Sequence, residues 1–158
     1  MGNIIRNGIM YKGIDEYIPE HINSFTQKNV DKVLKIENDM QDIDEILKVS
    51  VGSNIINNKI VKTAIGTSLE GQILTGYKSI SEGEFDVRID CCAEDSSSSV
   101  YTFREKIFFN NSTTLSQNCN LNSKIFENIY IEDIYCQKIS SREILINISF
   151  IFIAESFW

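Results

Sequence analysis

The amino-acid sequence predicts an all-β fold: a single antiparallel β-sandwich, jelly-roll-like or barrel-like, with an N-terminal arm that forms a strand. Three observations support this prediction: apolar and polar residues alternate with a period of two, polar clusters separate the alternating runs, and helical signals are scarce. The chain has 158 residues, of which 42% are hydrophobic and 23% are charged. This composition is that of a globular domain with a core of its own.

The alternating runs place the predicted strands. Phe85, Val87 and Ile89 alternate with charged residues, which is typical of a strand with one buried face and one solvated face. Other runs are rich in isoleucine and aromatic residues, which suit a pleated, half-buried surface. The strands predicted in this way cover residues 46–56, 59–65, 72–92, 100–109, 125–137 and 142–154.

Three local patterns refine this prediction. The run Ile55–Val61 predicts a hairpin, because Asn57 and Asn58 tolerate the positive φ angles of a tight turn. The spacing of Asp42 and Glu45 is that of a helix capping box, but alternation resumes at once, so we expect one helical turn there at most. The C-terminal strand carries few charges, and at a sheet edge it would be a template for pairing with another chain.

Residues 1–28 are expected to form a strand and a connector, and residues 29–158 the sandwich. Two interpretations of the N-terminal strand are open. It is the first strand of the same sandwich, as most terminal strands are, or it bridges to a neighbouring subunit and supplies main-chain hydrogen bonds to an open sheet edge. The residues of this candidate assembly strand are Asn3, Ile4, Ile5, Ile9, Met10 and Tyr11.

The sequence has no arrangement of residues typical of an enzyme or a cofactor site. Its one histidine, His21, has no partner residues nearby that would complete a catalytic site, so we expect an exposed side chain and no enzymatic activity. Gly66, Gly71 and Gly76 lack the ending of a phosphate-binding loop and are interpreted as turn and bulge positions. The adjacent cysteines at 91 and 92 and the acidic clusters lack zinc or calcium spacing, so no metal or cofactor is expected.

The four cysteines are the most reactive residue type in the chain. Strand alternation predicts that Cys91 is buried and Cys92 points outward, and a polar turn predicts that Cys119 is exposed. Exposed thiols on a protein released from the cell are able to form intermolecular disulfides, and reduced thiols without a function are the alternative. The candidates for intermolecular disulfides are Cys92, Cys119 and Cys136.

Charge and targeting signals limit the classes of partner that are expected. The net charge of −7 and the lack of a basic stripe along the sequence argue against nucleic acid as a partner. The N-terminus lacks the apolar run of a signal peptide, so synthesis in the cytoplasm without secretion by that route is expected. The longest apolar run, Ile144–Ala154, is interrupted by Asn147 and Ser149 and is too short to span a bilayer as a helix, so no membrane partner is expected.

One stretch of the sequence has the character of a family motif. Residues 62–78 read KTAIGTSLEGQILTGYK, preceded by Phe25-Thr26-Gln27 and followed by Glu82-Gly83-Glu84 and, at residues 130–135, by YIEDIY. These segments resemble the SPOCS domain, a family of spore-coat-associated proteins of clostridia and their relatives. The resemblance covers about Phe25 to Glu155.

The resemblance implies a function that the composition and spacing do not. SPOCS proteins have no established enzymatic activity, and their association with the spore coat implies a structural protein of the endospore coat or surface. Such a protein would assemble with itself, and with other coat proteins, into a filament, sheet or coat layer. The alternative is a non-catalytic binding module that recruits another coat protein or a small ligand. Unpaired sheet edges would favour assembly, and a deep apolar pocket would favour binding.

Overall fold

The computed structural model describes residues 2–20, 22, 24–67, 69–71, 73–94 and 99–156, and the regular secondary structure in these residues is β-strand throughout. The all-β prediction is confirmed. His21 and most of the serine-rich loop at residues 96–99 lie outside the described residues. The strands are β1 (Gly2–Arg6), β2 (Ile9–Ile14), β3 (Phe25–Lys35), β4 (Ile43–Thr67), β5 (Ile73–Ala93), β6 (Val100–Thr114), β7 (Ile125–Ser140) and β8 (Glu143–Ser156).

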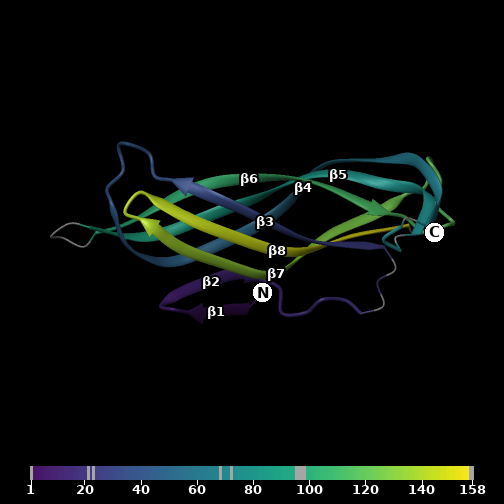
Figure 1. Ribbon diagram of the computed structural model, residues 1–158. Coiled ribbons are helices and arrows are strands. Elements are labelled where there is room, and N and C mark those ends of the chain that lie inside the picture. Colours follow the sequence, from purple (N-terminus) through teal and green to yellow (C-terminus); the bar gives the residue numbers. More distant parts are fainter. Residues whose placement is uncertain are drawn as a thin grey trace.

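The strands form two sheets that pack face to face (Figure 1). One sheet has the order β1-β2-β4-β5-β6, and the other has the order β3-β8-β7. The predicted sandwich is confirmed, and the sheets do not close into a barrel. The sequence predicted antiparallel pairing throughout. The structure differs, because β2 runs parallel to β4 over Met10–Lys12.

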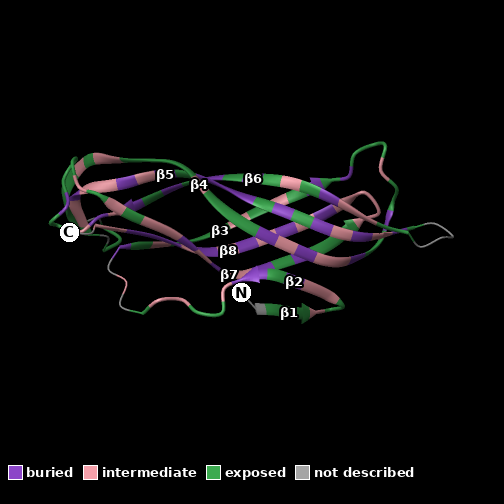
Figure 2. Cartoon of the chain, turned by 180° about the vertical axis from the view of Figure 1, so that it is seen from behind, coloured by how far each residue is buried: buried purple, intermediate pink, exposed green. Residues whose placement is uncertain are grey.

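Alternating side chains from both sheets fill the space between them. The rings of Phe85, Phe109 and Phe150 lie with their centroids 4.9 to 5.0 Å apart and join β5 and β6 of one sheet to β8 of the other. Figure 2 shows the alternation as buried segments that recur along the strands of the sandwich. The fully buried row of β8 consists of Ile144, Ile146, Ile148, Phe150 and Phe152.

The hairpin predicted at Ile55–Val61 is wrong. Strand β4 continues through this segment, and Asn57 and Asn58 pair with Glu82 and Ser81 of β5. Neither asparagine has a positive φ; among the described non-glycine residues, Asn7 is the one that does. A register shift between Ile55 and Asn57 accommodates the polar insertion without turning the chain.

The structure decides two further questions that the sequence left open. The sequence allowed at most one helical turn at residues 42–45, and no helical turn forms there, because β4 begins at Ile43, which is fully buried in the core. The C-terminal strand β8 is not at an edge: it lies between β3 and β7 and is paired on both sides. Its near-uncharged sequence therefore reflects a central position, and it is not available as a template for another chain.

Candidate assembly surface

The N-terminal residues form a tight hairpin at one edge of the five-stranded sheet. Asn7 and Gly8 connect β1 to β2 with φ angles of 52° and 78°, which is the left-handed geometry of a two-residue turn. Strand β1 is the last strand of this sheet, so its outer edge has no partner strand in the described chain. Figure 2 shows β1 as largely exposed at the margin of the molecule.

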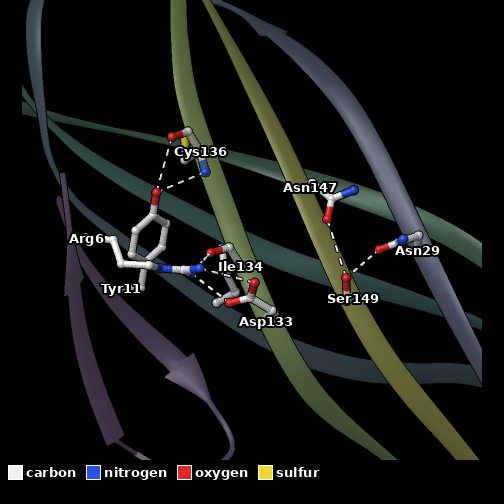
Figure 3. A network of polar contacts seen from close by, with 8 residues as sticks. All are labelled: Arg6, Tyr11, Asn29, Asp133, Ile134, Cys136, Asn147 and Ser149. Atoms are coloured by element: carbon white, nitrogen blue, oxygen red, sulfur yellow. Dashed lines mark hydrogen bonds and ion pairs between the residues drawn. The ribbon is translucent and has the colours of Figure 1, made fainter.

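Tyr11 joins this hairpin to the opposite sheet. Its hydroxyl donates a hydrogen bond to the carbonyl oxygen of Cys136 at 3.2 Å and accepts one from the N–H of Cys136 at 3.0 Å (Figure 3). The side chain is 2% exposed, and burial raises the pKa of its hydroxyl. One phenol therefore satisfies both main-chain groups of Cys136 on the outer edge of β7.

Arg6 adds a second link between the same two elements. Its guanidinium lies 2.7 Å from the Asp133 carboxylate, donates to the carbonyl oxygen of Ile134, and stands 4.8 Å from the centre of the Tyr11 ring (Figure 3). The hydrogen bond to Asp133 is the main reason that the pKa of Arg6 is raised. Arg6 is the one charged residue of β1 and is directed at β7, so β1 has no other charge to repel an approaching strand.

Gly13 allows β2 to approach β4. It has a φ of 117°, and a Cβ atom at this position would lie 2.2 Å from the carbonyl oxygen of Val51. Tyr11 and Ile14, on either side of it, are buried in the core. In this chain the hairpin is therefore part of the sandwich, although the sequence allowed it to be an arm that crosses to a neighbour.

The six candidate assembly residues divide into two groups. Ile9, Met10 and Tyr11 belong to β2, which lies between β1 and β4. Asn3, Ile4 and Ile5 belong to β1 and retain an open edge. Ile5 is 68% exposed and Ile4 40% exposed.

The turn determines which main-chain groups of β1 face outward. In a two-residue hairpin the flanking pair, here Arg6 and Ile9, is hydrogen-bonded, and bonded and non-bonded pairs then alternate. Ile5 is opposite Met10 in the next, non-bonded pair. The N–H and C=O groups of Ile5 therefore point away from β2 and towards any strand that adds to this edge.

The outer edges of β3, β6 and β7 are partly covered within the described chain. Strands β3 and β6 face one another and are bridged by the hydroxyl of Thr26, 2.8 Å from that of Thr113, and by an ion pair of 3.1 Å between Lys32 and Glu105. The outer edge of β7 receives Tyr11 and also Asp15, whose N–H donates to the carbonyl oxygen of Ile131 at 2.9 Å. The outer edge of β1 has less cover than these three edges, and β4 beyond Ser50 also has no strand partner on its β2 side in the described chain.

The segment that resembles the family motif forms the far end of the β4–β5 hairpin. Gly71 lies in the turn with a φ of 84°, and Gly76, with a φ of 104°, lies where the register shifts between Lys62 and Ile65. These two glycines occupy a turn and a bulge position as predicted, whereas Gly66 pairs with Leu74 within the regular ladder. This end is apolar and exposed: Ile65, Leu69 and Ile73 have exposed fractions of 82%, 108% and 62%. Exposed apolar side chains gathered at one place are typical of an interaction surface.

The cysteines are more buried than the sequence predicted. Cys91 is fully buried, as expected, but the predicted exposure of Cys119 is wrong: it is 3% exposed. The loop after β6 folds over the end of the sandwich, where the N–H of Cys119 donates to the carbonyl oxygen of Ser116 at 3.1 Å and Leu115 is buried beside it. The polar residues around Cys119 therefore do not expose the turn as a whole.

Burial also limits the chemistry of the thiols. It raises the pKa of Cys91 and of Cys136 to about 12, so both are protonated at neutral pH and are poor nucleophiles. No disulfide joins any two of the four cysteines. Of the three disulfide candidates, Cys119 and Cys136 are buried, and only the half-buried Cys92 has surface that a neighbouring subunit would reach.

The interior holds one polar layer that the sequence did not reveal. The hydroxyls of Ser79 and Ser81 donate to the carboxylate of Glu127 at 2.7 and 2.8 Å, across the space between the two sheets. Ser81 and its cross-strand partner Asn111 are buried. These contacts join the two sheets. A separate finding is that no group of histidine, cysteine and acidic residues able to bind a metal ion occurs in the described part of the chain.

Comparison with protein-family models, with curated proteins and with solved structures finds no significant match for this chain. Within the described residues, no helix is long and apolar enough to cross a membrane. The features that bear on function are therefore the open edge of β1, the apolar hairpin end and the sequence resemblance.

Proposed function

We propose that this protein is a structural subunit that assembles with copies of itself by β-strand addition, within the coat or surface layer of an endospore. The observation that carries the mode of assembly is the outer edge of β1. It presents unpaired main-chain groups, two exposed isoleucines and no outward charge. Exposed edges of this kind are templates for pairing with another chain.

The spore coat as the location is supported by the resemblance of residues 62–78 and their flanking segments to SPOCS proteins. Antibody labelling of sectioned endospores tests it: the label is expected in the coat or outer surface, and label confined to the spore core would contradict it.

Cys92 is the cysteine we propose for disulfide links between subunits. Assemblies are then expected to dissociate more readily with reductant, and identical behaviour with a Cys92→Ser variant would contradict this link.

Substitution of Ile5 by proline tests the mode of assembly. The N–H of Ile5 is not used within the hairpin, so proline should leave the fold intact, since proline is tolerated at strand edges where the N–H faces solvent. It removes the outward donor and places the ring in the path of an added strand. We expect wild-type protein to form large particles in sedimentation velocity and negative-stain images, and Ile5→Pro to remain a folded monomer.

Ile5→Val is the matched control, because it keeps the N–H and most of the apolar side chain. It should assemble like wild type. Wild-type protein that remains monomeric over a wide concentration range would contradict self-assembly. An Ile5→Pro variant that assembles normally would contradict pairing at β1. Point substitution is preferable to deletion of the N-terminal segment, since deletion would also remove Tyr11 and Ile14 from the core.

A further inference from the structure

A row of cationic side chains crosses the outer face of the five-stranded sheet. The register places Lys12 of β2 opposite Ser50 of β4, Ser50 opposite Arg88 of β5, and Arg88 opposite Arg104 of β6. Residues opposite one another share a face of the sheet, so these four side chains lie in one line. Lys48 stands beside this row, opposite Met10 and Asp90.

The sequence does not show this row, because its members come from four strands that are far apart along the chain. No basic stripe runs along the sequence, and the row forms only where the strands pair. The row is also unusual for its setting, since the chain has a net charge of −7. We name the row, with Lys48, the cationic groove.

The charges in the cationic groove are poorly compensated. Arg88 and Arg104 are directly opposed, a pairing of like charges that destabilises a sheet. Lys12, Lys48 and Arg104 form no hydrogen bond or ion pair with any described residue. The Nε of Arg88 lies 3.5 Å from the carboxylate of Asp90, which also accepts from the hydroxyl of Thr102 at 2.6 Å.

The same surface is hollowed. Gly13 and Gly52 contribute no side chains to it, and the groove has a volume of about 430 Å³. Its lining includes Lys12, Lys48, Arg88 and Arg104 and one carboxylate, that of Asp86. With Asp90 counted as a second carboxylate, four positive and two negative charges leave two positive charges without a counter-charge.

We propose that the cationic groove binds the dianionic phosphate of a small phosphate monoester or free phosphate. Two guanidinium groups on adjacent strands, with Cβ atoms about 4.5 to 5.5 Å apart, are able to hold the oxygens of one phosphate group. The hydroxyl of Ser50 lies between Lys12 and Arg88 as a further donor. A phosphate near neutral pH carries about −1.5 to −2 charge, which matches the uncompensated charge of the groove.

This proposal does not depend on assembly, because the groove lies on a face of the sheet and the proposed assembly site is the edge of β1. A small ligand is favoured over nucleic acid because four cations in an acidic protein make too short a track for a phosphate backbone. The binding site would also serve a subunit that recruits a phosphorylated small molecule into the coat.

Equilibrium dialysis of the full chain with radiolabelled inorganic phosphate, at constant ionic strength near neutral pH, tests the proposal. We expect one phosphate bound per chain, with affinity reduced about tenfold or more in Lys48→Gln and in Arg104→Gln. Lys35→Gln removes the same charge from an exposed position on β3 in the other sheet, and should change the affinity by less than about twofold. Arg104→Lys keeps the charge without the planar fork and should fall between wild type and Arg104→Gln.

Two further measurements identify the ligand. Binding should weaken as the pH falls below about 6, where phosphate loses its second negative charge. Phosphoserine should compete with phosphate, and dimethyl phosphate, which carries one negative charge, should compete poorly. Absence of phosphate binding, or equal losses in Lys48→Gln and Lys35→Gln, would overturn the proposal. An oligonucleotide that binds more tightly than phosphate, and is lost in Arg104→Gln, would overturn the assignment to a small ligand.

Discussion

Tyr11 is the residue through which the N-terminal hairpin is joined to the second sheet. Alternation in the sequence predicts that Tyr11 lies in a strand. Its partner, Cys136, lies 125 positions away, and no local sequence pattern indicates that contact. The same holds for Arg6 and Asp133, which are 127 positions apart. Local pattern thus predicts which side chains are apolar or buried, whereas the pairing of polar groups across the sandwich depends on topology.

Tyr11→Phe should destabilise the protein although it changes one buried oxygen atom. It leaves the N–H and C=O of Cys136 without their partner, which costs about 1 to 3 kcal/mol in the free energy of unfolding. Tyr135→Phe is the control: its side chain is 40% exposed and bonds to Gln137 at the surface, so a change below about 0.5 kcal/mol is expected. Urea denaturation measures both values, and equal losses would show that the buried pair has no special role.

The thiol of Cys136 should make the protein less stable in alkaline solution. Burial raises its pKa from 9.0 to about 12, so between these pH values the folded chain retains a proton that the unfolded chain loses. The contribution to stability is complete below about pH 9 and declines as the pH rises towards 12. From about pH 8 to pH 10.5, wild type should lose about 2 kcal/mol more than Cys136→Ala, and parallel losses in urea denaturation would contradict this.

At the level of elements, the sequence predicted the regular strands well and the irregular ones poorly. The alternation of Phe85, Val87 and Ile89 located β5, because one face of that strand is buried and the other is wet. The sequence did not predict strand β3, because Phe25–Lys35 is largely polar and exposed. This segment forms a strand by pairing with β8. Asn57 and Asn58 suggested a turn, but the adjacent β5 offered them ladder partners.

Gly13→Ala should weaken the attachment of the hairpin to β4. The new methyl group would lie against the carbonyl oxygen of Val51, and alanine disfavours a φ of 117°, so a loss of about 2 to 4 kcal/mol is expected. Gly52→Ala, where a Cβ meets nothing within 4 Å, should change stability by less than about 0.5 kcal/mol. Thermal and urea unfolding compare the two variants. Equal stability would mean that β2 moves away from β4 without cost.

At the level of the whole molecule, the sandwich leaves the edge of β1 less covered than the edges of β3, β6 and β7. Strands β3, β6 and β7 are bridged by side chains or by the connector after β2, whereas β1 presents Ile5 outward. The sequence left open whether residues 3–5 pair within the sandwich or with a neighbour, and whether the C-terminal strand lies at an edge; the latter strand is central. Whether a strand lies at the edge or in the centre of a sheet depends on the order of the strands, and no local part of a single sequence encodes that order.

The most direct test of strand addition is the protection of the Ile5 amide against hydrogen exchange as the protein assembles. In the monomer this N–H faces solvent and should exchange rapidly, while the N–H of Ile4, in a bonded pair with Tyr11, should be protected. If subunits add strands at β1, exchange at Ile5 should slow by about tenfold or more in the assembled protein and remain fast at low concentration. Assemblies in which the Ile5 amide exchanges as fast as in the monomer would contradict the proposed function.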